Sequence, residues 1–143
     1  MILVDANLLL YAHLEQSDHH AAARDWLSHT LSGPYPVRIA WMTILAFLRI
    51  STDLRLSGHP LRMEEASGIV NDWLGQPSVS ILTPGERHWE ILRDLLKTAQ
   101  VRGALTSDAH LAALALEHGA TLCTTDRNFS RFPGLRTANP IEA

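Results

Sequence analysis

Three aspartates, Asp5, Asp108 and Asp126, stand at positions where carboxylates could act together. Asp5 directly follows the apolar residues 2–4, and Asp126 lies just past the strand expected at residues 121–124. Asp108 falls in the first turn of the helix expected before residues 121–124. In a parallel sheet, the carboxyl ends of the strands and the N-termini of the crossover helices share one edge, where α/β folds bind their ligands. We therefore expect the three carboxylates to face that edge.

Clustered carboxylates repel one another, so some take up protons unless a cation is present. The positive end of a helix also favours the ionised form of Asp108. Hard anionic oxygens of this kind suit Mg²⁺ or Mn²⁺. Such a cation can ready a water for attack and stabilise a leaving oxygen. The cluster therefore predicts a metal site that acts on a phosphodiester.

Each aspartate also has an ordinary structural interpretation. Asp5 could cap the helix that follows it, and Asp108 could simply stabilise a helix N-terminus. Asp126 could form an Asx turn before Asn128. The placement of all three at one edge favours the metal site, but spacing alone leaves both interpretations open.

Strand-like and helical segments alternate along the chain. Short apolar runs predict strands, and apolar residues at helical spacing predict helices, with Thr43 as the N-cap of the third helix and Gly119 as a C-terminal cap. The predicted strands are 2–4, 37–40, 79–82, 121–124 and a short 135–137, and the predicted helices are 8–13, 19–31, 43–54, 63–73, 86–101 and 107–118. Such alternation predicts an α/β fold, a three-layer α/β/α sandwich around a mainly parallel sheet.

Length and composition agree with one domain over residues 1–143. A single cysteine, Cys123, cannot form an internal disulfide, which suits a reducing compartment. The apolar N-terminus has no basic segment before it and is interrupted by Asp5, and no apolar run reaches the roughly 18 residues of a membrane span. We therefore expect a soluble, cytoplasmic protein without a membrane partner. The net charge of −3 neither favours nor excludes a nucleic-acid substrate.

Three segments resemble the motifs of PIN-domain proteins, in the order and spacing of the VapC toxins: residues 2–12, 105–120 and 124–132. The resemblance covers essentially the whole chain. It implies a PIN-like fold and a Mg²⁺- or Mn²⁺-dependent endoribonuclease that cleaves cellular RNA, such as transfer or ribosomal RNA, and so inhibits translation and growth. It also implies a homodimer and a VapB-type antitoxin, in a complex of two or more toxin–antitoxin units. By position, Asp5, Asp108 and Asp126 become the metal ligands.

The chain departs from the family pattern at Ala46, where relatives usually carry a second acid on this helix. Alanine has no ligand atom, so the number of metal ions is open. Asp53 lies seven residues further on, about 10 Å along a helix, and is a poor substitute. Asn128 stands where many relatives have another aspartate, and its neutral oxygen could contact a metal-bound water.

Several neighbouring side chains are candidates for supporting roles. Asn7 and Ser107 flank the acids and could orient a carboxylate or a water, although Ser107 could equally cap its helix. Thr125 could hold Asp126 in place. Arg49, Arg127 and Arg131 could contact RNA phosphates, with ordinary surface charge or ion pairing as the alternative.

Two other functions remain open. Ala46 could mark a degenerate protein that only binds RNA or its antitoxin. A phosphatase with Asp5 as nucleophile is less favoured, because that class usually has a second aspartate where Asn7 stands and a catalytic lysine, whereas the only lysine here is Lys97. For the antitoxin, we expect a groove formed partly by helices 19–31 and 43–54, which carry more large apolar residues than one core-facing stripe needs.

Overall fold

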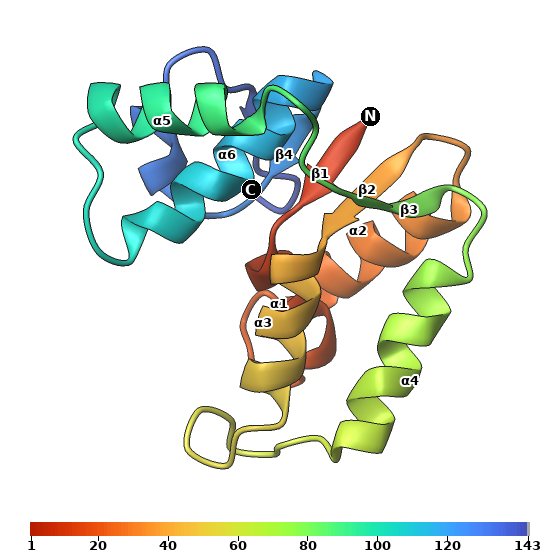
Figure 1. Ribbon diagram of the computed structural model, residues 1–143. Helices are drawn as coiled ribbons and strands as arrows, with labels where there is room; N and C mark the ends of the chain where they lie inside the picture. Colours follow the sequence, from red (N-terminus) through yellow and green to blue (C-terminus); the bar gives the residue numbers. More distant parts are fainter. Residues whose placement is uncertain (143) are drawn as a thin grey trace.

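Five short parallel strands form the centre of the computed structural model, which describes residues 1–142 (Figure 1). Every pair of neighbouring strands is parallel, so the sheet is wholly rather than mainly parallel. The strands run in the order β3-β2-β1-β4-β5, which leaves β1 in the middle. Their bounds are β1 Ile2–Val4, β2 Val37–Ala40, β3 Val79–Leu82, β4 Thr121–Cys123 and β5 Thr137–Ala138.

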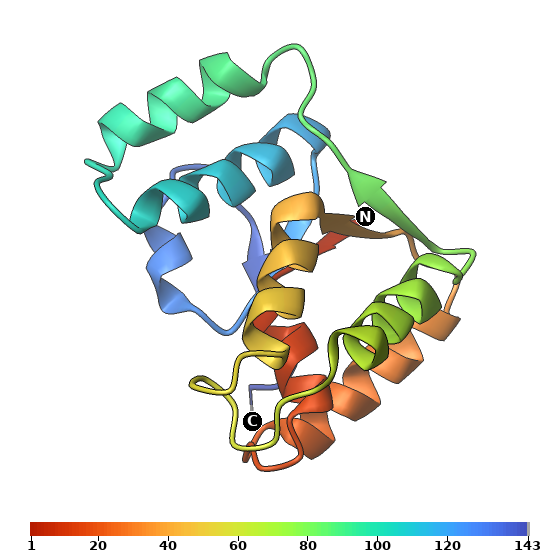
Figure 2. The ribbon, with the colours of Figure 1, turned by 60° about the horizontal axis from the view of Figure 1, so that its bottom comes forward.

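Helices cover both faces of this sheet, as the alternation of the sequence predicts. The helices are α1 Ala6–His13, α2 His20–Ser32, α3 Trp41–Ser51, α4 Met63–Leu74, α5 His88–Thr98 and α6 Leu105–His118, followed by the 3-10 helix η1 Arg127–Arg131. Figures 1 and 2 show α5 alongside α6, on the opposite side of the sheet from α2 and α4. The predicted three-layer α/β/α architecture is confirmed.

Two separate apolar cores follow from the alternation of side chains along the strands. Val4 and Ile39 pack with α1 to α4 in one core, whereas Leu3 and Ala40 pack with α5 and α6 in the other. Because neighbouring residues of a strand point to opposite faces, a strand as short as β1 contributes to both cores. Its last residue, Val4, is followed at once by Asp5, so the buried strand fixes where that carboxylate emerges.

Three helices, α1, α3 and α6, begin earlier than the sequence predicts, and α1 starts at Ala6. Helix α3 starts at Trp41, directly after β2, and α6 starts at Leu105. The residues at their N-caps, Ala40 and Ala104, make no side-chain capping bond, so Thr43 is not an N-cap and lies inside its helix. Helix α3 begins early because β2 continues into it without a loop, and the backbone changes direction at Ala40.

The remaining boundaries are close to expectation. Gly119 ends α6 in the left-handed conformation, with φ of 68°, as predicted for a C-terminal cap. Helix α5 is shorter than predicted, and β5 begins at Thr137 rather than residue 135. Among residues 1–142, no helix combines the length and the apolar character that crossing a membrane requires.

Candidate active site

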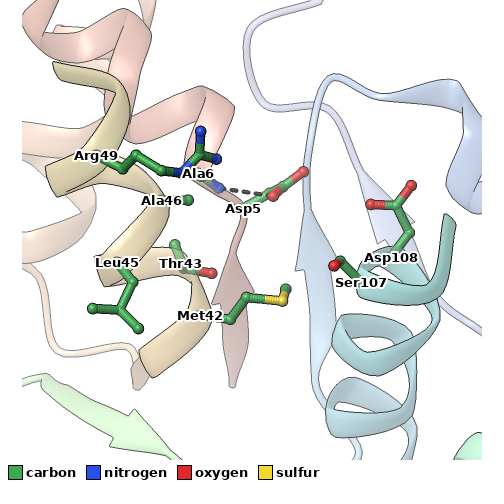
Figure 3. Close-up of a pocket in the computed structure, with 9 residues that line it drawn as sticks. All are labelled: Asp5, Ala6, Met42, Thr43, Leu45, Ala46, Arg49, Ser107 and Asp108. Atoms are coloured by element: carbon green, nitrogen blue, oxygen red, sulfur yellow. Dashed lines mark hydrogen bonds between the residues drawn. The ribbon is translucent and has the colours of Figure 1, made fainter. Parts of the chain in front are cut away.

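An open pocket of about 760 Å³ lies at the carboxyl edge of the sheet, between the start of α1, α3 and the start of α6 (Figure 3). We call it the aspartate pocket. It is lined by Asp5, Ala6, Met42, Thr43, Leu45, Ala46, Arg49, Ser107 and Asp108. Asp5 and Asp108 therefore meet at one pocket, as the topology argument predicts.

Asp5 is held rigidly at the end of β1. One carboxylate oxygen accepts a hydrogen bond from the Ala6 backbone N–H at 2.8 Å, which caps α1, and the other accepts one from the Thr124 hydroxyl at 2.7 Å. Burial raises the pKa of Asp5, and the nearby Asp126 raises it further, against the lowering effect of these two bonds. The capping role is therefore real, but each oxygen keeps a lone pair that faces no protein donor.

Thr124 links two of the aspartates. Its hydroxyl donates to Asp5 and accepts from the backbone N–H of Asp126 at 3.0 Å, and the side chain is only 4% exposed. The sequence offered Thr125 as a candidate to hold Asp126, whereas the side chain that bonds to the Asp126 backbone in the structure is Thr124. Thr124 points inward directly after β4, whereas Thr125 lies at the next position and makes no such bond.

Asp108 lies in the first turn of α6, on the far wall of the aspartate pocket (Figure 3). Burial, followed by repulsion from Asp126 and Asp5, raises the pKa of its carboxyl group, and Arg131 partly offsets this effect. No hydrogen-bond donor within residues 1–142 engages the Asp108 carboxylate. It is therefore available to a ligand.

Asp126 faces a neighbouring hollow instead of lining the aspartate pocket. Its carboxylate accepts a hydrogen bond from the Asn128 backbone N–H at 2.8 Å and so caps η1, as the Asx-turn interpretation foresaw. The charge of Asp126 still reaches the other two aspartates, whose pKa values it raises. Over residues 1–142, however, no three acidic, histidine or cysteine side chains converge closely enough to enclose a metal ion.

The donor chemistry of the aspartate pocket nevertheless fits a divalent cation. Asp5 and Asp108 present anionic oxygens, and burial together with repulsion from neighbouring carboxylates raises the pKa of both carboxyl groups. Mg²⁺ commonly binds through one or two carboxylates and fills its other positions with waters and phosphate oxygens. Two carboxylates on facing walls are sufficient for such a site.

The α3 wall offers no carboxylate to this pocket. Ala46 contributes only its methyl group, and Asp53 lies past the end of α3, where its carboxylate accepts from the Arg55 backbone N–H at 2.8 Å. Thr43 is buried, and its hydroxyl has no hydrogen-bond partner within the described chain. The single charged group on this wall is Arg49.

The other candidate residues divide between the site and its surroundings. Ser107 lines the aspartate pocket and does not cap α6. Asn7 lies in the first turn of α1, with its carbonyl oxygen buried and unpartnered among residues 1–142. Arg127 is almost fully exposed and pairs with Glu142 at 3.5 Å beside the hollow at Asp126. Asn128 contacts Asp126 through its backbone.

Arg131, one of the arginines expected near the site, lies at the same edge as Asp108. It affects the pKa of Asp108 from η1, twenty-three positions further along the chain. Its proximity depends on how η1 folds back toward α6. A basic residue within the last motif was the only signal in the sequence.

Replacement of Thr124 by valine tests the link between the aspartates. Thr124→Val keeps the side-chain volume but removes the hydroxyl, so Asp5 loses a donor and the Asp126 backbone N–H loses an acceptor. We expect the RNA cleavage that the sequence resemblance implies, measured as an initial rate, to fall about 10- to 100-fold, the usual effect of losing a group that orients a ligand. Thr124→Ser should recover most of the rate, and an equal loss in both variants would contradict the role of the hydroxyl.

The chain is similar to known proteins over nearly its whole length. The family model described as PIN domain matches residues 2–135. The chain is 44% identical to ribonuclease VapC37 of Mycobacterium tuberculosis, across 98% of this chain and 97% of that protein. It is 36% identical to ribonuclease VapC33 of the same species, across 99% of both.

Solved structures show the same fold at low identity. VapBC2 from Rickettsia felis, bound to a DNA fragment of its promoter, matches with a TM-score of 0.70 at 19% identity, across 97% of this chain and 98% of that one. VapC20 of Mycobacterium tuberculosis, described as a sarcin-ricin loop cleaving toxin, matches with a TM-score of 0.66 at 18% identity, across 95% and 99%.

Proposed function

The chain belongs to the PIN-domain family, in its VapC group of toxin ribonucleases, and from this membership we propose that it is a metal-dependent endoribonuclease that hydrolyses phosphodiester bonds in cellular RNA. We further propose transfer or ribosomal RNA as the substrate and inhibition of translation as the consequence. The match to relatives named ribonucleases extends over nearly the full length of both chains, which supports the first statement.

The observation that carries the proposal is the pairing of Asp5 and Asp108 across one open pocket. Both carboxyl groups have raised pKa values, and neighbouring carboxylates contribute to each shift. Uncompensated negative charge in a pocket destabilises the protein unless a cation binds. A bound cation would also reduce the repulsion between this anionic pocket and a phosphodiester.

We propose Mg²⁺ or Mn²⁺, held by Asp5 and Asp108, with Asp126 acting from the adjacent hollow. When bound, such a cation supplies charge stabilisation to the phosphodiester and lowers the pKa of a bound water. The protein's own contribution is positioning. Thr124 and the N-terminus of α1 fix the Asp5 carboxylate, and Thr124 also holds the backbone of Asp126.

Cleavage of total cellular RNA by the purified protein, free of any antitoxin, tests this function. We expect discrete fragments when Mg²⁺ or Mn²⁺ is added, and none with excess EDTA. Restoration of cleavage by added Mn²⁺ after EDTA treatment would exclude irreversible damage, and the fragment ends would name the RNA. Cleavage that persists in EDTA would contradict metal dependence.

A binding-only protein is the second candidate, because Ala46 leaves one wall of the pocket without a ligand. It predicts that a folded protein with Mn²⁺ bound still leaves RNA intact while retaining affinity for it. The same assay distinguishes the two functions if RNA binding is measured in parallel. No observation favours the phosphatase, since Lys97 does not line the aspartate pocket.

We also propose a VapB-type antitoxin as partner, by similarity to the VapBC complexes whose fold this chain shares. A largely apolar groove of about 260 Å³ between α1, α2 and α4 is a candidate surface, lined by Ala12, His13, Arg24, Leu27, Ser28, Leu31, Ile69, Asp72 and Trp73. We expected helices 19–31 and 43–54 to form part of the antitoxin groove. Residues of α2 line this groove, whereas residues of α3 do not. A complex with the antitoxin bound elsewhere would refute this placement. Homodimer formation stays a prediction.

A further inference from the structure

The aspartate pocket is lined by one basic side chain, Arg49. Figure 3 shows Arg49 extending from α3 toward Ala6, on the side of the pocket away from Asp108. Arg49 is exposed, and within residues 1–142 no carboxylate lies within 4 Å of it. An unpaired guanidinium at the rim of an acidic pocket is therefore available to an anion from outside the protein.

The nearest acid on the same helical face does not neutralise Arg49. Asp53 is four residues further on, at a spacing where ion pairs often form. Its carboxylate is instead engaged by Arg55, which donates from its backbone N–H at 2.8 Å and from its side chain at 3.4 Å. Arg49 makes only the smallest of the contributions that lower the pKa of Asp53.

Ala46 explains why Arg49 stays free. It lies one turn before Arg49 on the same wall, and an acidic side chain there would face the guanidinium at the i, i+3 spacing. Alanine provides neither a ligand for a cation nor a partner for Arg49. The α3 wall therefore has cationic rather than anionic character, and the carboxylates of the aspartate pocket come from β1 and α6.

We propose that Arg49 binds a phosphate of the RNA on the α3 wall, and that the pocket holds a single divalent cation between Asp5 and Asp108. A guanidinium presents a planar fork of donors that matches two phosphate oxygens. Arg49 thus contributes positive charge on the wall where a carboxylate would otherwise recruit a second cation. This inference rests on the proposed function and specifies how the substrate is held.

Metal-free RNA binding tests the phosphate contact separately from catalysis. The probe is a fluorescently labelled transfer RNA, titrated with protein in excess EDTA at several salt concentrations. Arg49→Ala is expected to weaken binding about tenfold and to lower the slope of log K against log salt by about one, since one phosphate contact is lost. Arg49→Lys, which keeps the charge, should retain part of the affinity.

Two matched variants complete the binding experiment. Arg93→Ala removes an exposed arginine of α5 that pairs with Asp94, far from the pocket lining, and should leave the affinity unchanged. Ala46→Glu should weaken binding as much as Arg49→Ala, because the new carboxylate engages the guanidinium. Equal affinity of wild-type and Arg49→Ala proteins, or no metal-free binding by the wild type, would overturn the proposal.

Counting bound Mn²⁺ by electron paramagnetic resonance tests the single cation. We expect one ion per chain for the wild type, and two would overturn that part of the inference. Failure of the proposed function looks different, because an inactive protein would still show the Arg49-dependent affinity in EDTA. Cleavage by the wild type combined with unaltered binding by Arg49→Ala would refute this inference alone.

Discussion

Asp5→Asn is expected to lower the rate of RNA cleavage by about a thousandfold while the protein stays folded. The cation that we propose Asp5 holds would supply several kcal/mol of charge stabilisation, and each 1.4 kcal/mol corresponds to a factor of ten in rate. The amide oxygen of asparagine can still accept from the Ala6 N–H, so the N-terminus of α1 keeps its cap. The measurement is the initial rate at saturating Mn²⁺.

Asp25→Asn is the matched control for this substitution. Asp25 lies on α2, is mostly exposed and contacts only the neighbouring Arg24, so its neutralisation should leave the rate within about twofold, as for most surface changes. Circular dichroism and thermal melting of both variants confirm the fold. A wild-type rate in Asp5→Asn, with its Mn²⁺ affinity unchanged, would show that Asp5 serves only as a helix cap.

Phe47→Ala is expected to lower the free energy of unfolding by about 3–5 kcal/mol, the usual cost of removing a buried aromatic ring. Phe47 is fully buried on α3, and its ring packs edge-on against Trp73 of α4 at 4.6 Å between centroids and against His13 of α1 at 5.7 Å. Its loss leaves a cavity where three helices meet. Urea denaturation followed by fluorescence measures the change.

Leu45→Ala provides a comparison on the same helix. Leu45 is 62% exposed, so its truncation should cost no more than about 0.5 kcal/mol. A loss below about 1 kcal/mol in Phe47→Ala would contradict the role of this ring. Because α3 also forms one wall of the aspartate pocket, a large loss of stability should be accompanied by weaker Mn²⁺ binding at temperatures near the transition.

The sequence alone was sufficient to predict the architecture and the meeting of Asp5 with Asp108. Apolar runs such as residues 2–4 and 79–82 alternate with helical patterns, and a parallel sheet is the arrangement that buries both. Once the strands are parallel, Asp5 at a strand end and Asp108 at a helix start must share an edge. The first inference depends on the spacing of apolar residues along the chain, and the second depends on the parallel topology. Neither requires the positions of individual side chains.

The first residues of the helices were less predictable, because a polar residue near a helix N-terminus can either cap the helix or lie within its first turns and face a pocket. Thr43 and Ser107 have the residue types of N-caps, yet both lie inside their helices and line the aspartate pocket. The true N-caps are Ala40 and Ala104, which carry no capping side chain. Helix α3 begins at Trp41 because β2 continues into it without a loop. The position of β2 in the sheet, which belongs to the tertiary structure, therefore sets where α3 starts.

Tertiary structure also decided the finer organisation of the site. Which of two adjacent threonines turns inward depends on the residue at which β4 ends, and this choice selects Thr124 over Thr125. The capping of η1 draws Asp126 into a neighbouring hollow, and the pairing of Asp53 with Arg55 leaves Arg49 free. Each of these outcomes depends on a single hydrogen bond or on a shift of one residue along the chain, and the apolar pattern specifies neither. The burial of whole strands and helix faces, by contrast, follows from that pattern.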